Sequence, residues 1–170
     1  MVRETLYNEF TGRFELLYKD DPLGYHMPVH AHNAAEIYYT LDDLENVLLG
    51  DKVYHIPGDS LIFIPSFCNH RIVTQDDWAF RRYILTVNMN WLASVLGAEK
   101  EDRPHFWAVP SAINVTGEKK TRIETSLKKM CNGMQRGSIL EMRIFLEVIE
   151  EIEKLSGDAK TKAGGQIQME

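Results

Sequence analysis

The chain has 170 residues, a length that suits one folded domain with its own hydrophobic core. Hydrophobic residues make up 44% and charged residues 26% of the chain, which excludes the disordered, collagen-like and membrane-spanning classes. The net charge of −6 argues against direct binding to nucleic acid, because that binding depends on Lys and Arg side chains that neutralise phosphates.

The first ten residues do not form the apolar core of a signal peptide, because Arg3, Glu4 and Glu9 interrupt the apolar positions. No apolar run elsewhere is long enough to cross a membrane. The two cysteines, Cys68 and Cys131, are too few for a disulfide framework, and we expect both to be reduced. These features predict a cytoplasmic protein.

Short β-like segments separated by turn residues occupy residues 14–87. Their sequences are FELLYKD, EIYYTL, NVLLGDKVYHI, SLIFIP and AFRRYILTV. Gly50-Asp51 predicts a tight hairpin turn, and residues 57–59 predict a type II turn with a positive φ at Gly58. Strands at this spacing predict a β-sandwich or barrel.

Helical periodicity replaces the β pattern after residue 88. Residues 90–96 predict a short helix, and apolar residues at spacings of three and four predict longer helices at 117–134 and 138–155. Thr116 is the expected N-cap of the first long helix. The mainly β region is therefore followed by two C-terminal helices.

The helix predicted at 138–155 has apolar residues on more than one side. One stripe contains Phe145, Val148, Ile152 and Leu155, and the other contains Met142, Leu146 and Ile149. One stripe can pack against the barrel, and the other can contact a second protein chain. We therefore expect a homodimer formed through residues 138–155, with Phe145 and Val148 at the contact.

Three histidines and one glutamate form the candidate site. Residues two apart on a strand share a face, so His30 and His32 point the same way, and Glu36 and Tyr38 keep that parity if the intervening turn preserves register. His70 comes from a separate strand. Three imidazoles and a carboxylate inside a barrel suit Zn, Fe, Mn or Ni, with positions left for water or a ligand.

These residues resemble the two motifs of the cupin superfamily. The first motif is a Gly, five residues, His-x-His, three or four residues and a Glu, matched by Gly24, His30, His32 and Glu36. The second motif is a Gly, a Pro and a His five residues after that Pro, matched by Gly58, Pro65 and His70. Asp43, Phe67 and Thr74 stand where the motifs have Gly, Gly and Asn. The resemblance implies a double-stranded β-helix, or jelly-roll barrel.

Within the cupins, residues 10–156 are more similar to the N-terminal ligand-binding domain of AraC/XylS-type transcription regulators. The similarity lies in the order of His30-x-His32, EIYY, the turn with FIP, FRRYIL and two final helices. In that family the barrel binds a small effector, an N-terminal arm closes over it, and the helices dimerise. The resemblance implies an effector-sensing domain that is not an enzyme and that lacks the family's helix-turn-helix DNA-binding domain.

Two further side chains are candidates for effector binding. Tyr38 and Tyr39 alternate, so one lines the cavity and the other packs outside. Arg81 and Arg82 alternate likewise. One of the two could contact an anionic effector, or both could belong to a strand face that is exposed to solvent. We assign Tyr38 and Arg82 to the ligand-binding set, together with the histidines and Glu36.

The expected division of the chain has three parts. Residues 1–112 form the effector-binding barrel with its N-terminal arm, residues 113–156 form the helical pair, and residues 157–170 form a linker or tail. The expected partners are a small-molecule effector and a second copy of the chain, with DNA reached only through a segment absent from this chain.

Two other functions stay open. One is a metal-dependent cupin enzyme, of the dioxygenase or isomerase type, in which His30, His32, Glu36 and His70 hold the ion. The other is a free-standing cupin that binds a small molecule. Many AraC-type sensors bind organic effectors without a metal, so the presence of a divalent transition metal is also open.

Overall fold

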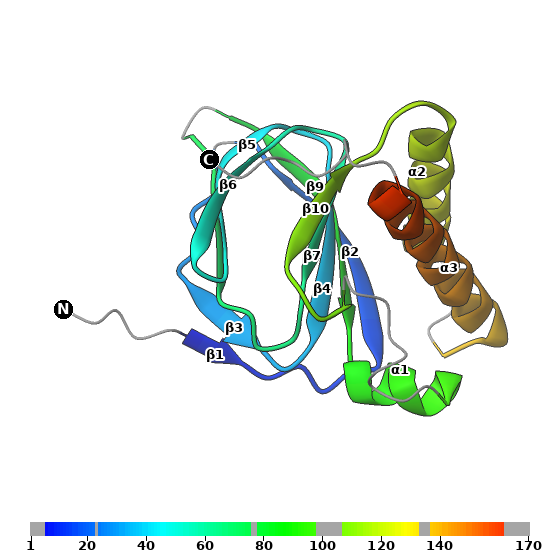
Figure 1. Cartoon of the computed structure of the whole chain (residues 1–170). Helices are drawn as coiled ribbons and strands as arrows, with labels where there is room; N and C mark the ends of the chain where they lie inside the picture. The colour runs from blue at the N-terminus through cyan, green and yellow to red at the C-terminus, as the bar shows by residue number, and fades with distance from the viewer. Residues whose placement is uncertain (1–5, 23, 76–77, 98–106, 133–136, 162–170) are drawn as a thin grey trace.

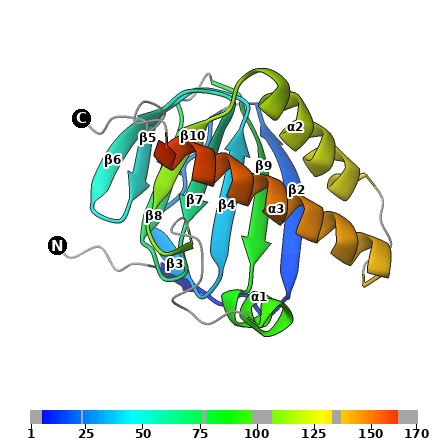
Figure 2. The ribbon, with the colours of Figure 1, turned by 45° about the vertical axis from the view of Figure 1, so that its right-hand side comes forward.

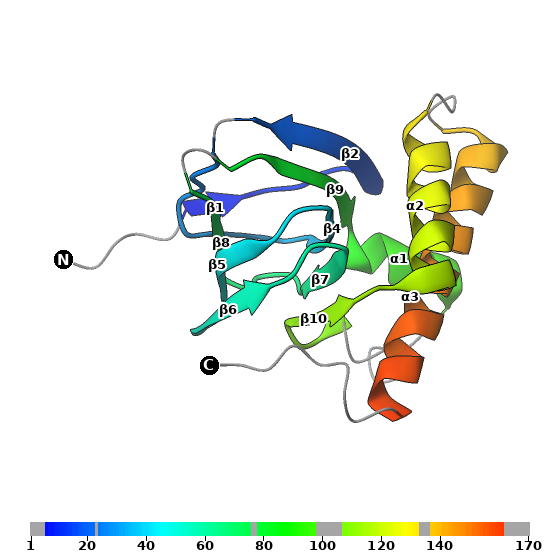
Figure 3. The ribbon, with the colours of Figure 1, turned by 90° about the horizontal axis from the view of Figure 1, so that it is seen from above.

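The computed structural model of the protein describes residues 6–22, 24–75, 78–97, 107–132 and 137–161 (Figure 1). In these ranges ten strands form two sheets, with strand orders β1-β3-β8-β5-β6 and β10-β7-β4-β9-β2. The two sheets face each other as a barrel, and helices cover the outer side of the second sheet (Figure 3). The mainly β, cupin-type fold with C-terminal helices is confirmed.

The element bounds follow the predicted segments closely. The first sheet contains β1 (Leu6–Asn8), β3 (His30–His32), β5 (Leu44–Leu49), β6 (Lys52–Ile56) and β8 (His70–Val73). The second sheet contains β2 (Phe14–Asp21), β4 (Ala35–Thr40), β7 (Ser60–Ile64), β9 (Phe80–Val87) and β10 (Ser111–Asn114). The helices are α1 (Met89–Leu96), α2 (Gly117–Cys131) and α3 (Ile139–Thr161).

The central strands of the second sheet are buried on both faces. Tyr38 pairs with Ile62 and Ile84, and all three side chains join the core inside the barrel. Their neighbours along the strands, such as Tyr39 and Phe63, face the helices instead. Burial on both sides explains why the segments EIYYT and SLIFI are almost continuously apolar.

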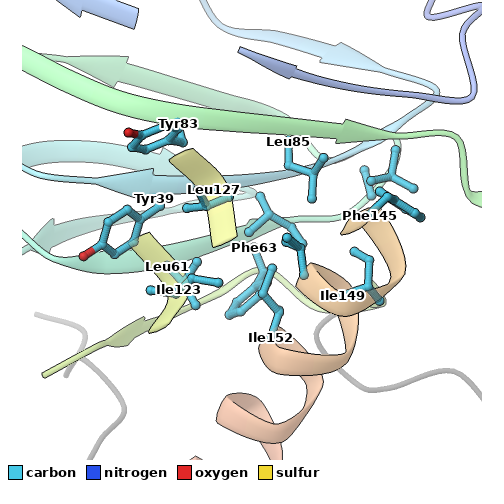
Figure 4. Close-up of a cluster of buried hydrophobic side chains, with 14 of the residues drawn as sticks. Tyr39, Leu61, Phe63, Tyr83, Leu85, Ile123, Leu127, Phe145, Ile149 and Ile152 are labelled. Carbon is cyan, nitrogen blue, oxygen red and sulfur yellow. The ribbon is translucent and has the colours of Figure 1, made fainter. Parts of the chain in front are cut away.

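The second core lies between this sheet and the helices. Figure 4 shows side chains of β4, β7 and β9 against side chains of α2 and α3. The labelled residues are Tyr39, Leu61, Phe63, Tyr83, Leu85, Ile123, Leu127, Phe145, Ile149 and Ile152. The helical pair is therefore part of the fold, because it seals a sheet face that is otherwise apolar and exposed.

The expectation that Phe145 and Val148 lie at a dimer contact is wrong. Both side chains are completely buried within the chain, because α3 crosses the outer face of the second sheet (Figure 2). The Phe145 ring stacks on Phe14 at 4.2 Å and lies 5.5 Å from Trp91. The second stripe also packs on this core, with Ile149 buried and Met142 and Leu146 partly buried.

The two predicted turns differ in outcome. Gly50 has a φ of 66° at the first position of the two-residue hairpin between β5 and β6, as predicted. The positive φ expected at Gly58 is wrong, because it falls at Asp59, with a φ of 58°. Gly58 is required for close approach, since a Cβ there would lie 2.8 Å from the carbonyl oxygen of Leu41.

The first strand and the last helix lie at the two ends of the described chain. β1 pairs in parallel with β3, so the N-terminal arm is hydrogen-bonded to the strand that carries His30 and His32. α3 continues to Thr161, beyond the predicted end at 155, and residues 162–170 of the expected tail lie outside the described residues. No described helix is both long and apolar enough to cross a membrane.

Replacing Phe145 with Ala should destabilise the fold by about 3–5 kcal/mol, because it removes a buried aromatic ring and leaves a cavity between α3 and the sheet. Urea unfolding measures the change. The control is Val95→Ala on α1, where the side chain is 46% exposed, and it should change stability by less than about 0.5 kcal/mol. Similar effects of both substitutions would contradict the packing of α3.

Candidate functional site

The three histidines of the candidate site come from neighbouring strands. His30 and His32 lie on β3, and His30 is paired directly with His70 at the start of β8. The ring centroids of His30 and His70 are 4.1 Å apart, and one ring nitrogen from each of the three histidines lies within 4.8 Å of the others. All three side chains are buried.

Backbone carbonyl groups fix the orientation of each imidazole. Nδ1 lies 3.1 Å from the Pro28 oxygen in His30, 2.8 Å from the Ala34 oxygen in His32 and 3.0 Å from the Cys68 oxygen in His70. A carbonyl oxygen only accepts hydrogen bonds, so each Nδ1 carries the proton and donates it. In the neutral rings, each Nε2 therefore presents a lone pair.

Glu36 faces the histidines from β4 in the opposite sheet. Its Oε2 lies 3.3 Å from Nε2 of His32 and 3.5 Å from Nε2 of His70. The hydroxyl of Thr86, on the neighbouring strand β9, donates to Oε1 at 3.4 Å. Thr86 was not predicted, although it shares the inward parity of Arg82 on β9 and that parity could have identified it.

The electrostatics favour a charged carboxylate among the histidines. Burial alone would raise the pKa of Glu36, but the interactions with His32 and His70 outweigh it and hold the pKa well below its usual range. For His32, burial lowers the pKa, yet the Glu36 carboxylate raises it above its ordinary value. His30 has its pKa lowered by burial and by the neighbouring His70.

The cluster has unsatisfied buried atoms that suit a bound cation. Within the described structure, Nε2 of His32, Nε2 of His70 and Oε2 of Glu36 are buried without hydrogen-bond partners. Burying such atoms unpaired is unfavourable. Imidazoles held by hydrogen bonds at Nδ1 and presenting Nε2 are typical of metal-binding histidines. His30, His32, His70 and Glu36 thus fit a divalent transition metal.

The other two candidate residues have different surroundings. Tyr38 points into the barrel and is buried, and burial raises its pKa well above the ordinary value. Arg82 is 2% exposed, forms an ion pair with Asp21 at 2.5 Å and places its guanidinium over the rings of Tyr25 and Phe80. Its Nε is buried without a partner in the described structure. Arg82 is therefore not on a solvated face.

Phe67 is a further structural determinant of the site. It has a φ of 64°, and it stands where the second cupin motif has glycine, the residue that adopts this conformation freely. Its backbone N–H donates to the His32 carbonyl oxygen at 2.7 Å, which ties the loop before His70 to β3. Phe67 therefore adopts the backbone conformation that a glycine would adopt at this position, and it does so with backbone strain.

The barrel, the interior cluster and the two covering helices define a cupin-type domain. Over residues 14–148, the chain matches the family described as the AraC-like ligand binding domain. The chain belongs to this family. No curated protein is similar enough in sequence to count as a match.

Solved structures with the same fold include ToxT from Vibrio cholerae O395, bound to (E)-4-(8-methylnaphthalen-1-yl)but-3-enoic acid. It is 8% identical with a TM-score of 0.52, and the match covers 85% of this chain and 58% of ToxT. A Cupin 2 conserved barrel domain protein from Salinispora arenicola CNS-205 is 15% identical with a TM-score of 0.42, covering 52% of this chain and 74% of that chain. At 8% identity, the likeness to ToxT shows the fold alone.

Replacing Glu36 with Gln should lower the pKa of His32 below its ordinary value, because the carboxylate raises that pKa and burial opposes it. Histidine titration by NMR in chelator-treated protein measures the change. In the wild type, the raised pKa of His32 contributes stability that is full at low pH and is lost as pH rises through the folded-state pKa. Glu36→Gln should remove this contribution.

The matched control is Glu45→Gln, at an exposed carboxylate on β5. It should leave the His32 titration unchanged. If Glu36→Gln also left it unchanged, the contact between Glu36 and His32 would not exist in solution.

Proposed function

We propose that this chain is the effector-sensing domain of an AraC-type transcription regulator, with a small molecule bound inside the barrel. The observation that carries the proposal is the convergence of His30, His32, His70 and Glu36, with unsatisfied atoms, in a domain of the AraC-like ligand-binding family. The sensor acts in the cytoplasm, without catalysis, and reaches DNA through a segment other than residues 1–170.

The surroundings of the cluster support a ligand with both polar and apolar parts. Tyr38 and Ile84 lie next to Glu36 and Thr86 on the inward faces of β4 and β9. Arg82 follows on the same face of β9, and an anionic group of the ligand would share its guanidinium with Asp21. ToxT, a protein of the same fold, is bound to a carboxylic acid with an aromatic body.

A metal-dependent cupin enzyme is the second candidate, and the orientation of the histidines favours it. Fixed Nδ1–H groups and free Nε2 atoms form the ligand arrangement that His30, His32 and His70 would offer to a divalent ion, with Glu36 as the fourth ligand. When bound, such an ion supplies Lewis-acid polarisation of a substrate oxygen. A free-standing small-molecule-binding cupin would use the same cluster without the ion.

The division of the chain belongs to the same proposal. Residues 1–112 bind the effector, residues 113–156 hold the helical pair, and residues 157–170 are a linker or tail, of which residues 157–161 continue α3. A homodimer through residues 138–155 must use outward side chains, since Phe145 and Val148 are buried. Ile139 and Leu140 at the start of α3 are 90% and 48% exposed and provide apolar surface for that contact.

Zn²⁺, Fe²⁺, Ni²⁺ or Mn²⁺ added to chelator-treated protein, with oxygen excluded for Fe²⁺, should raise the melting temperature if the cluster binds metal. At a hundredfold excess over Kd the stabilisation is about 2.7 kcal/mol, which corresponds to about 5–10 °C for a domain of this size. His70→Ala should abolish the shift. The matched control His55→Ala, at an exposed histidine on β6, should retain it.

Metal content and ligand content of protein purified without chelator then separate the candidates. A co-purified organic molecule that restabilises the stripped protein and is returned unchanged supports the sensor. Conversion of that molecule by metal-loaded protein supports the enzyme and overturns the sensor proposal. If none of the ions shifts the melting temperature, the metal-dependent enzyme is excluded and the cluster binds its effector directly.

Replacing Ile139 and Leu140 together with Glu should shift the chain from dimer to monomer in sedimentation velocity, because two charges would enter an apolar contact. The control is Val95→Glu on α1, where the side chain is 46% exposed. It should leave the sedimentation unchanged. A dimer that survives the Ile139 and Leu140 substitutions would use another surface.

The chain alone should bind DNA weakly and without sequence preference, because its net charge of −6 leaves little surface that can neutralise phosphates. Fluorescence anisotropy at physiological salt, with a candidate promoter and a scrambled duplex, makes the comparison. Tight and promoter-selective binding by residues 1–170 would overturn the assignment of DNA contact to another segment.

A further inference from the structure

A cavity of about 570 Å³ lies outside the His and Glu cluster, at the end of the barrel where α1 begins. Figure 1 shows α1 at this lower end. The walls are the turn between β3 and β4, the loop between β7 and β8, the first turn of α1 and residues 107–108. The volume lies in the range of small-molecule sites in proteins. None of the four cluster residues lines it.

Polar groups in the wall are held in fixed orientations. The Asn88 Oδ1 accepts hydrogen bonds from the backbone N–H groups of Asn90 and Trp91, both at 3.1 Å, and this cap directs its NH₂ group away from the helix. Asn33 is fixed by two hydrogen bonds with the backbone of Phe10. The hydroxyl of Ser66 is buried without a partner in the described structure, so it is available to a ligand.

The apolar part of the wall is equally fixed. Trp107 is 8% exposed, and its side chain hydrogen-bonds Glu153 of α3, so the indole N–H is engaged while the ring borders the cavity. Phe67 keeps its strained φ of 64° and its ring stacks on Tyr7 with an interplanar angle of 6°. Strained residues that persist in this way concentrate at binding sites.

The side chains that line the cavity determine which ligand charge it favours. Among the described residues that line the cavity, none has a charged side chain. A charged ligand would lose hydration here without gaining a counter-ion from the described part of the wall. An uncharged ligand could use the amide of Asn88 and the hydroxyl of Ser66, with an apolar face on Met89 and Trp107.

We propose that this cavity is a second binding site, separate from the His and Glu cluster, for an uncharged, hydroxyl-bearing small molecule with one apolar face. The site goes beyond the proposed function, since that function uses the barrel interior. Its occupant touches the barrel loops, α1 and Trp107 at once, and Trp107 is hydrogen-bonded to α3. Binding therefore stabilises the arrangement of the barrel end and the helices.

Benzyl alcohol, benzoate and benzylammonium are matched probes of nearly equal size and different charge. The indole N–H resonance of Trp107 in ¹H–¹⁵N spectra reports binding. Benzyl alcohol should shift this resonance with increasing concentration, and the two charged probes should bind at least about tenfold more weakly, because the described part of the wall offers them no counter-ion. Ser66→Ala should weaken binding by roughly two- to tenfold, the loss expected for one hydrogen bond.

Ala108→Trp fills the cavity from an exposed position and should abolish the response, whereas His55→Ala should preserve it. Thermal unfolding is measured on the same Ala108→Trp protein, and a cooperative transition like that of the wild type shows that the fold is intact. A Trp107 resonance that does not respond to benzyl alcohol overturns the proposal. An equal response to benzoate, or unchanged binding by Ala108→Trp, does so as well. Each of these results leaves the proposed function untouched.

Discussion

The central strands of the second sheet, β7, β4 and β9, are buried on both faces, and the rest of the structure depends on this constraint. A strand places successive side chains on opposite sides, so one set of residues fills the barrel and the next set binds the helices. Tyr38 and Tyr39 illustrate the division, since one lies inside the barrel and the other lies under α2. The inward face of these strands therefore carries the residues of the candidate site, and the outward face carries the contacts with the helices.

Local hydrogen bonds fix the orientation of the histidines inside the barrel, while Nε2 of His32, Nε2 of His70 and Oε2 of Glu36 are without hydrogen-bond partners in the described structure. Each histidine donates Nδ1–H to a carbonyl two residues away, so the orientation of the rings follows from the backbone of β3, its turn and the loop before β8. Glu36 comes from the opposite sheet and compensates the proton or cation that the free Nε2 atoms attract. The distance between the sheets therefore sets the geometry of the site.

Much of this arrangement could be predicted from the sequence. Strand parity places His30, His32 and Glu36 on inward faces, and the cupin motifs add His70 from another strand. The surface that the apolar stripes of α3 contact could not be predicted, because the stripes look the same whether they meet a second copy or the sheet of the same chain. Both stripes pack against the sheet of the same chain. The sequence feature that indicates this is the almost continuously apolar segment of β7, whose five residues are all buried in the structure.

The backbone conformations of turns and the positions of cavities depend on contacts between segments that are distant in the sequence. A local sequence pattern does not specify those contacts. Gly58 is demanded by the nearby carbonyl of Leu41, and the positive φ falls one residue later. Phe67 keeps a glycine-like conformation because its N–H is held by the His32 carbonyl oxygen and its ring by Tyr7. The cavity near α1 likewise arises where four separate segments meet.

Contacts between the second sheet and α2 determine how a change inside the barrel reaches the helices. The Tyr39 hydroxyl donates to Glu124 at 3.1 Å, and Lys120 forms an ion pair with Asp59 at 2.7 Å. Tyr39 is adjacent to Tyr38, so the two side chains cannot touch, and a ligand beside Tyr38 reaches α2 only by moving β4 itself. The buried cores on both faces resist such movement. A ligand therefore shifts the helices only to the extent that it binds one strand position better than the other.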